Sequence, residues 1–213
     1  MIGATPLRPV GPSERTQRAV FKAASVLLRS KGGAATFTME RVASRAKIAK
    51  TTLYRWWPTK IALLMEVFEQ AATKRLLGMQ LYGSVDADLR HLLRGLLRLL
   101  RSTSAGAAVI GMIIEAQLNP KLAPIFREEF VVRGRVLTRR ALLQALRKGD
   151  LPSGTNIDLA IDILSGAIWY RLLLANAPLD NAYADGIVDV LLYGIRKEGA
   201  ALSAKVGDAD SSK

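Results

Sequence analysis

Residues 38–60 gather side chains that can bind the phosphates and the base edges of a nucleic acid. Lysine and arginine supply phosphate contacts, while threonine and tyrosine hydroxyls can hydrogen-bond to phosphates or base edges. The threonine methyl group can also touch a thymine methyl in the major groove. The residues that we expect to contact DNA are Thr38, Lys47, Lys50, Thr51, Thr52, Tyr54, Arg55, Trp56 and Lys60.

Two short helices joined by a tight turn would position these side chains. Thr38 has the chemistry of an N-cap, because its hydroxyl can accept a hydrogen bond from the free N–H groups of the first helical turn. A second helix is expected from about Lys50 to Trp57. Leu53 and Trp57 are four residues apart and would face the core, which leaves the polar residues on the other faces. Pro58 then ends the helix, since the residue before a proline disfavours the α conformation.

This helical pair has two interpretations. A recognition helix of about this length fits the DNA major groove when a first helix braces it across the backbone. The alternative is an ordinary basic amphipathic hairpin. Residues 1–60 hold twelve Lys and Arg against two Asp and Glu, whereas residues 61–213 hold nineteen against sixteen. Such a concentration of positive charge is typical of a protein that binds a polyanion. A membrane surface is the rival polyanion, but it would require a wide apolar face left open to lipid.

The same stretch resembles the TetR family of bacterial transcriptional regulators. The closest match is residues 52–60, which follow the family's pattern of a recognition helix followed by a proline and a lysine. Phe21, Ala24 and Leu28 match the apolar positions of the family's first helix. The resemblance is specific over about residues 13–70 and beyond them rests on length and helical pattern.

Two residues depart from the family pattern. The family usually has a glycine in the turn, where this chain has Lys47, and a serine or threonine capping the recognition helix, where this chain has Ala49. A left-handed backbone at Lys47 would cost about 1 kcal/mol, and the missing side-chain cap about 0.5–2 kcal/mol. We expect neither loss to break the motif, and we expect Lys47 to add a phosphate contact.

The whole chain is predicted to be all-α, with no strand pattern and no internal repeat. We expect an N-terminal three-helix helix-turn-helix DNA-binding domain and a C-terminal helical ligand-binding and dimerisation domain, about nine helices in all. The expected divisions are a flexible arm at 1–12, the DNA-binding domain at 13–72, the regulatory and dimerisation domain at 73–202 and a disordered tail at 203–213. Beyond the recognition helix, the expected helices span about 58–77, 86–103, 105–117, 120–148, 156–175 and 181–199. A basic stripe on the second of these is interpreted as a solvated face and consists of Arg90, Arg94, Arg98 and Arg101.

The last two expected helices, at 156–175 and 181–199, are too apolar for the surface of a monomer. Gly166 and Gly194 would let helices approach closely. We therefore predict a homodimer in which these helices form a four-helix interface, the alternative being that both pack internally.

The family resemblance implies a small-molecule effector held in the C-terminal domain. Met112, Phe126, Phe130 and Trp169 are candidate pocket residues, because flexible or flat apolar side chains suit the wall of a ligand site, although core packing explains each of them as well. Glu115 stands alone among apolar neighbours and is the candidate polar anchor, unless it has an internal basic partner.

The leading functional hypothesis is a dimeric repressor that a small molecule releases from a pseudo-palindromic, double-stranded DNA operator. A second hypothesis is a DNA-binding regulator controlled by a protein partner or by no ligand. An enzyme is not expected, because no nucleophile–histidine arrangement, paired carboxylate motif, phosphate-binding glycine loop or metal-ligand cluster is recognisable. No cofactor, metal site or membrane association is expected. The absence of cysteine and of an apolar leader or span favours a cytoplasmic protein.

Overall fold

The computed structural model describes residues 11–76 and 80–194, and every regular element in those ranges is helical. This confirms the predicted all-α class. The α-helices in the described ranges are α1 (Glu14–Arg29), α2 (Met39–Ala46), α3 (Lys50–Trp56), α4 (Lys60–Leu76), α5 (Val85–Ser102), α6 (Ala105–Leu118), α7 (Ala123–Phe126), α8 (Val136–Lys148), α9 (Ile157–Leu174) and α10 (Asn181–Tyr193). A 3-10 turn, η1 (Gly33–Thr36), precedes α2, and a π-helical turn, η2 (Arg127–Val132), follows α7.

Several predicted features lie outside the described residues. They are most of the arm at 1–12, the whole tail at 203–213 and the end of the last predicted helix beyond residue 194. The division of the chain at residues 72 and 73 stays a prediction.

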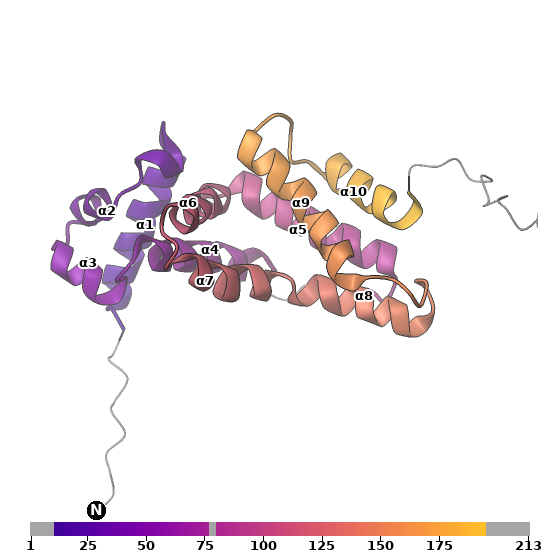
Figure 1. Cartoon of the computed structure of the whole chain (residues 1–213). Helices are drawn as coiled ribbons and strands as arrows, with labels where there is room; N and C mark the ends of the chain where they lie inside the picture. The colour runs from indigo at the N-terminus through magenta and orange to yellow at the C-terminus, as the bar shows by residue number, and fades with distance from the viewer. Residues whose placement is uncertain (1–10, 77–79, 195–213) are drawn as a thin grey trace, which may run out of the picture.

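Helices α1, α2 and α3 form one group at the N-terminal end of the molecule (Figure 1). The predicted cap is present, because the Thr38 hydroxyl accepts from the Arg41 N–H at 3.2 Å. The Ser13 hydroxyl caps α1 in the same way, by accepting from the Thr16 N–H at 3.3 Å. Leu53 is fully buried, and Trp57 packs edge-on against Phe21 with ring centroids 5.9 Å apart. Burial of these large side chains fixes α3 against α1.

Helix α4 runs from this group into the C-terminal helices, where it packs along α6 (Figure 1). The two helices approach closely at Gly111, where an added Cβ would lie 2.9 Å from Cδ1 of Leu64. Leu64 and Val109 are fully buried at this contact region. The group of α1, α2 and α3 is therefore joined to the rest of the molecule through one helix with a tightly packed flank.

Helices α5 and α6 meet at a sharp bend of 86°. Gly106 permits this approach, because a Cβ there would come within 2.5 Å of the Leu100 carbonyl oxygen. Within the described ranges, no single helix is long and apolar enough to cross a membrane, and α5 with α6 passes that test of length and composition only as a bent pair.

The interpretation of the α5 arginines as a solvated stripe is wrong for its first half. Arg90 makes two hydrogen bonds of 2.8 Å to Asp86 and also pairs with Asp189 of α10. Arg94 binds both carboxylate oxygens of Asp185 at 2.7 and 2.6 Å. The aspartates of α10 are distant in sequence, so periodicity on α5 alone could not disclose these partners. Arg98 and Arg101 are exposed, as predicted.

The predicted single helix over 120–148 is also wrong, because α7, η2 and α8 divide it. Pro124 lies in the first turn of α7, and Gly134 falls between η2 and α8. The wider π turn places Phe130 against Phe68 of α4, with ring centroids 4.9 Å apart. The π turn and the aromatic contact therefore occur at the same place, and π turns are frequent at functional sites.

Candidate nucleic-acid interface and ligand cavity

The turn between α2 and α3 is built without glycine. Lys47 adopts a left-handed backbone with φ 55° and ψ 45°, and its N–H bonds back to the end of α2. The N–H of Ile48 reaches the Ala43 carbonyl oxygen at 3.1 Å, which completes a C-cap of the usual kind. Ala49 begins α3 with no side-chain cap, as its type requires. Both departures from the family pattern are thus accommodated, with a left-handed lysine at the turn.

Most of the predicted DNA-contacting residues lie at the surface of this helical pair. Six of them are exposed, namely Thr38, Lys47, Lys50, Thr51, Tyr54 and Arg55. The other three are partly buried, namely Thr52, Trp56 and Lys60. Since Leu53 and Trp57 occupy the inner face, the exposed residues of α3 are free to meet a partner.

Three cations of this surface lack an acidic partner in the described part of the chain, unlike Arg90 and Arg94 of α5. Among the residues that the structure describes, Lys47, Lys50 and Arg55 take part in no ion pair. Arg90, in contrast, is paired with three aspartates, and Arg94 is paired with one, Asp185. Uncompensated positive charge attracts a polyanion and leaves the cations free to bind phosphate.

Two further cations belong to this surface and were missed by the sequence interpretation. Arg41 and Arg45 are exposed on α2, four residues apart, beside Glu40 and Ser44 in a shallow hollow. Their spacing places them on one helix face, which was the signal available in the sequence.

Tyr54 is held by a neighbour across the two helices. Its hydroxyl donates to Oε1 of Glu40 at 3.1 Å. Loss of hydration, followed by the hydrogen bond and charge of Glu40, raises the pKa of Tyr54. The backbone N–H of Glu40 and then the Tyr54 hydroxyl lower the pKa of the Glu40 carboxyl. Tyr54 therefore stays a protonated donor, and α2 and α3 are linked at their outer faces.

Lys60 lies in the first turn of α4, but its ammonium group is already engaged. Nζ of Lys60 donates to Oε1 of Glu115 on α6 at 3.0 Å, and their side chains are 19% and 25% exposed. The same Nζ lies 5.9 Å from the centroid of the Phe37 ring. Glu115, a candidate pocket anchor in the sequence, thus has a basic internal partner and joins the C-terminal domain to the edge of the DNA-binding surface.

Glu66 of α4 forms a second junction with the DNA-binding group. Its Oε1 accepts from Nε2 of Gln17 at 2.9 Å, and its Oε2 accepts from the Trp57 indole N–H. One carboxylate therefore holds α1, the end of α3 and α4 together.

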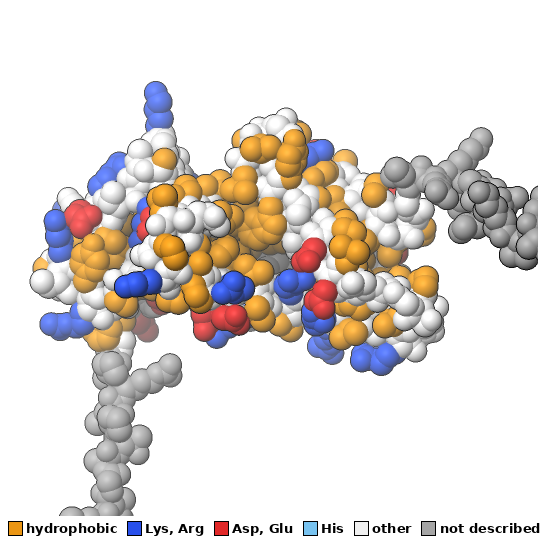
Figure 2. All heavy atoms as spheres, in the orientation of Figure 1, with side chains coloured by type: hydrophobic (Ala, Val, Ile, Leu, Met, Phe, Trp, Pro, Cys, Tyr) orange, Lys and Arg blue, Asp and Glu red, His pale blue; other side chains and the backbone are white. Residues whose placement is uncertain are grey.

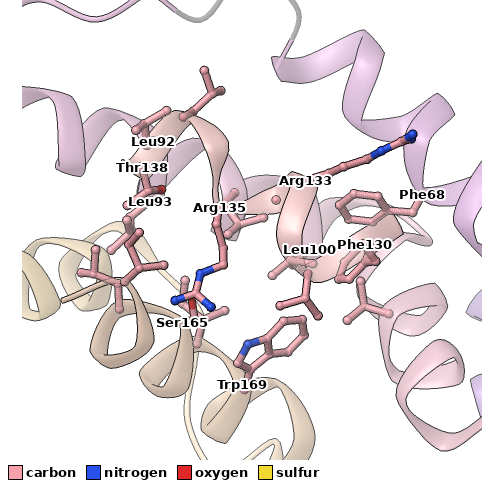
Figure 3. A pocket seen from close by; sticks show the side chains of 18 of the residues that line it. Phe68, Leu92, Leu93, Leu100, Phe130, Arg133, Arg135, Thr138, Ser165 and Trp169 are labelled. Carbon is pink, nitrogen blue, oxygen red and sulfur yellow. The ribbon is translucent and has the colours of Figure 1, made fainter. Parts of the chain in front are cut away.

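A cavity of about 480 Å³ lies among α4, α5, α8, α9 and η2. Figure 2 shows hydrophobic side chains concentrated over this middle part of the molecule, with acidic and basic side chains together along one edge. Phe68, Phe130 and Trp169 line one wall, and the Phe130 and Trp169 rings are 6.3 Å apart (Figure 3). The size and apolar lining are typical of small-molecule sites.

The five predicted pocket residues fall into two sets. Phe130 and Trp169 line the cavity. Met112 is fully buried in the core, Phe126 stacks on Phe130 at 5.3 Å, and Glu115 pairs with Lys60, and these three are not among the lining residues. Their role in ligand binding stays a prediction.

The polar lining residues were not found from the sequence. The side chain of Arg135 extends toward Ser165, whereas the side chain of Arg133 extends away from both of these residues (Figure 3). Arg135 donates to Oδ1 of Asp162 at 2.7 Å, and its Nε is buried with no hydrogen-bond partner. Thr138 also lines the cavity. These residues lie on separate helices or turns, so only the folded arrangement brings them together. Among the described residues, no three or more His, Cys, Asp or Glu side chains are grouped so that they could hold a metal ion.

Family models match both parts of the chain. Residues 20–67 match the model for bacterial regulatory proteins of the tetR family, and residues 81–191 match the model for the tetracyclin repressor-like C-terminal domain. The uncharacterized HTH-type transcriptional regulator YdeS of Bacillus subtilis (strain 168) is 33% identical over 190 residues, which are 89% of this chain and 94% of YdeS. The DNA-binding transcriptional repressor TetR of Mycobacteroides abscessus is 24% identical over 187 residues, covering 87% of this chain and 96% of that repressor.

Solved structures agree with this assignment. The TetR family transcription regulator SCO0332 is 31% identical, with a TM-score of 0.66 over 86% of this chain and 100% of that chain. The transcriptional regulator FadR from Bacillus subtilis, solved in complex with stearoyl-CoA, is 16% identical, with a TM-score of 0.63 over 84% of this chain and 100% of that chain, and it supports the fold alone. The helix-turn-helix with its uncompensated cations, the family models that span most of the chain and the relatives together show that this protein belongs to the TetR family of DNA-binding transcriptional regulators.

Proposed function

We propose that this regulator is a repressor that binds a pseudo-palindromic operator as a homodimer and leaves it when a small molecule enters the cavity. The observation that carries the proposal is the position of α4. Met65 of α4 lines the cavity, and the next residue, Glu66, holds Gln17 and Trp57 of the DNA-binding group. A ligand that displaces α4 would therefore move the recognition helix.

DNA contact would come from the exposed face of α3 and the turn before it. Lys47 and Lys50 would contact phosphates, while Thr51 and Arg55 would reach base edges in the major groove. Arg41 of α2 would brace the helix pair against the backbone. Such an interface would have affinity that falls steeply with salt, because binding releases counterions from the DNA.

An exposed apolar stripe on α9 supports the homodimer. Leu159, Ile163, Tyr170 and Leu173 follow helical spacing and are 54%, 45%, 56% and 47% exposed. Gly166 lies in the middle of this stripe, and an added Cβ there would meet no atom within 4 Å. Exposed apolar area of this kind usually marks an interface.

The exposed face of α10 extends the same kind of surface. Val190 and Tyr193 are 52% and 67% exposed at the end of that helix. Hydrophobic side chains lie at the surface over α9 in Figure 2. Two copies joined through α9 and α10 would form a four-helix interface and hold two recognition helices about one DNA turn apart.

Selection from a random DNA pool tests the proposal. The expected product is an inverted repeat, bound by two subunits with a salt-dependent affinity. Compounds screened against that complex are then expected to release it. Release by a protein alone, or no release by any compound, would favour the alternative regulator that does not respond to a ligand. Because its operator would lie on the bacterial chromosome, we also propose a cytoplasmic location.

A further inference from the structure

The charged groups that line the cavity are already paired with one another. Arg135 binds Asp162 at 2.7 Å, and Arg133 binds Glu129 at 2.9 Å. Glu69 lies 3.8 Å from Arg133. A ligand carboxylate would therefore find the charge of each arginine already neutralised by an acid, even where an N–H group of the arginine is unpartnered.

A cationic ligand meets a similar obstacle. The lining acids Glu69, Glu129 and Asp162 have side chains that are 54%, 45% and 64% exposed. They stand at the rim, where water and the two arginines satisfy them. The deeper wall is formed by side chains such as Leu93, Leu100 and Trp169. Burying an ion against such a wall without a free counter-ion is far more costly than burying a neutral group.

Neutral polar groups, in contrast, are free to bind. Ser165 of α9 and Thr138 of α8 line the cavity and are partly buried, and within the described part of the chain neither hydroxyl has a hydrogen-bond partner. A hydroxyl can both donate and accept, so each can serve a carbonyl or an alcohol. The unpartnered Nε of Arg135, whose side chain extends toward Ser165 in Figure 3, is a further donor in the same wall.

We propose that the cavity binds an uncharged, largely apolar molecule with one carbonyl or hydroxyl group, which hydrogen-bonds to Ser165 and Thr138. Its hydrocarbon part lies against the wall of Phe68, Phe130 and Trp169. This inference rests on the proposed effector role of the cavity, since it names the class of that effector.

Calorimetry with probes of equal chain length tests the class of ligand. The full-length protein is titrated with 2-octanone, 1-octanol, octane, octanoate and octyltrimethylammonium. The ketone and the alcohol are expected to bind at least about tenfold more tightly than either ion, because the ions bring a desolvation cost with no free partner. Tighter binding of either ion, or no binding of any probe, would overturn the inference.

Two substitutions test the assigned hydroxyls. Ser165→Ala and Thr138→Val preserve helix and shape, and each is expected to weaken ketone binding about three- to tenfold, as for a neutral hydrogen bond, while leaving octane binding unchanged. Ser102→Ala removes an exposed hydroxyl at the end of α5 and is expected to change nothing. Equal loss for the ketone and octane would refute the hydrogen bonds.

An operator-binding assay, run in parallel, tests the effector role of the cavity separately from the class of its ligand. A protein that binds the ketone but keeps its operator would preserve the ligand class and refute the effector role. A protein that releases its operator only to an ionic ligand would preserve the effector role and refute the ligand class.

Discussion

The ion pair between Lys60 and Glu115 leads to a counterintuitive prediction, namely that removing an acid from the C-terminal domain strengthens operator binding. In this structure the Lys60 ammonium group is bonded to Glu115 at 3.0 Å, although it stands at the N-terminus of α4, beside the DNA-binding surface. A DNA phosphate would compete with that carboxylate for the same cation. Glu115→Gln keeps the shape and removes the negative charge, so Lys60 becomes available to phosphate.

The size of the effect follows from the burial of the pair. With side chains 19% and 25% exposed, the pair lies between a surface salt bridge and a buried one, and we assign it about 1 kcal/mol per subunit. About 1 kcal/mol corresponds to roughly fivefold in Kd, and two half-sites in a dimer would give roughly thirtyfold. If each freed lysine gains one phosphate, the slope of log affinity against log salt should steepen by about 0.9 per subunit.

Fluorescence anisotropy with a labelled operator over a series of salt concentrations measures both quantities. Lys60→Met is the matched control, because Glu115→Gln should have no effect on DNA affinity in that background. Circular dichroism checks that the variants are folded. Operator affinity that is unchanged or weaker in Glu115→Gln, with the dimer intact, would refute the competition and would mean that the pair supports the DNA-binding arrangement.

Three more predictions concern the framework. Ile163→Arg should convert the dimer to a folded monomer in sedimentation and abolish operator binding, while Leu118→Arg, at a residue 77% exposed on α6, should leave the dimer intact; a dimeric Ile163 variant would remove α9 from the interface. Arg94 lowers the pKa of Asp185, so this group contributes stability that is present above its ordinary pKa of 3.8 and is lost as the pH falls through its lower, folded value. When the pH is lowered below about 4, the urea concentration at the unfolding midpoint should therefore decrease, and it should decrease less in Asp185→Asn than in the unsubstituted protein. An equal decrease in both proteins would contradict this. Gly106→Ala should destabilise the fold by about 1–3 kcal/mol because its Cβ meets the Leu100 carbonyl oxygen, whereas Gly154→Ala, with open space around it, should change the melting temperature little.

Some features of the helix-turn-helix could be predicted from the sequence because their causes are local. The hydroxyls of Ser13 and Thr38 each cap the helix that follows by accepting from the N–H group three residues later. Leu53 and Trp57 are buried because they share one face of α3. Local signals were insufficient where distant packing intervenes. Phe130 packs on Phe68 of α4, and the helix that carries Phe130 widens into a π turn.

The candidate site shows the same division. Lys47, Lys50 and Arg55 could be selected from residue type and from the face of a short helix. The aromatic wall was predicted only in part, since Phe130 and Trp169 line the cavity. Ser165 and Thr138 carried no signal in the sequence, because a hydroxyl on a helix is ordinary until its neighbours leave it unpaired inside a cavity.

The sequence by itself determined the helical class, the cap at Thr38 and the concentration of basic residues at 1–60, because each depends on neighbours within a few residues or on charge alone. Only the tertiary structure decided which charges are compensated. Lys60 and Glu115 are 55 residues apart and meet through the packing of α4 on α6, while Arg90 finds Asp189 across 99 residues. Such partners are chosen by how helices pack, and packing depends on the shapes of many side chains at once. A lysine predicted to bind DNA phosphate thereby became the link between the DNA-binding surface and the regulatory helices.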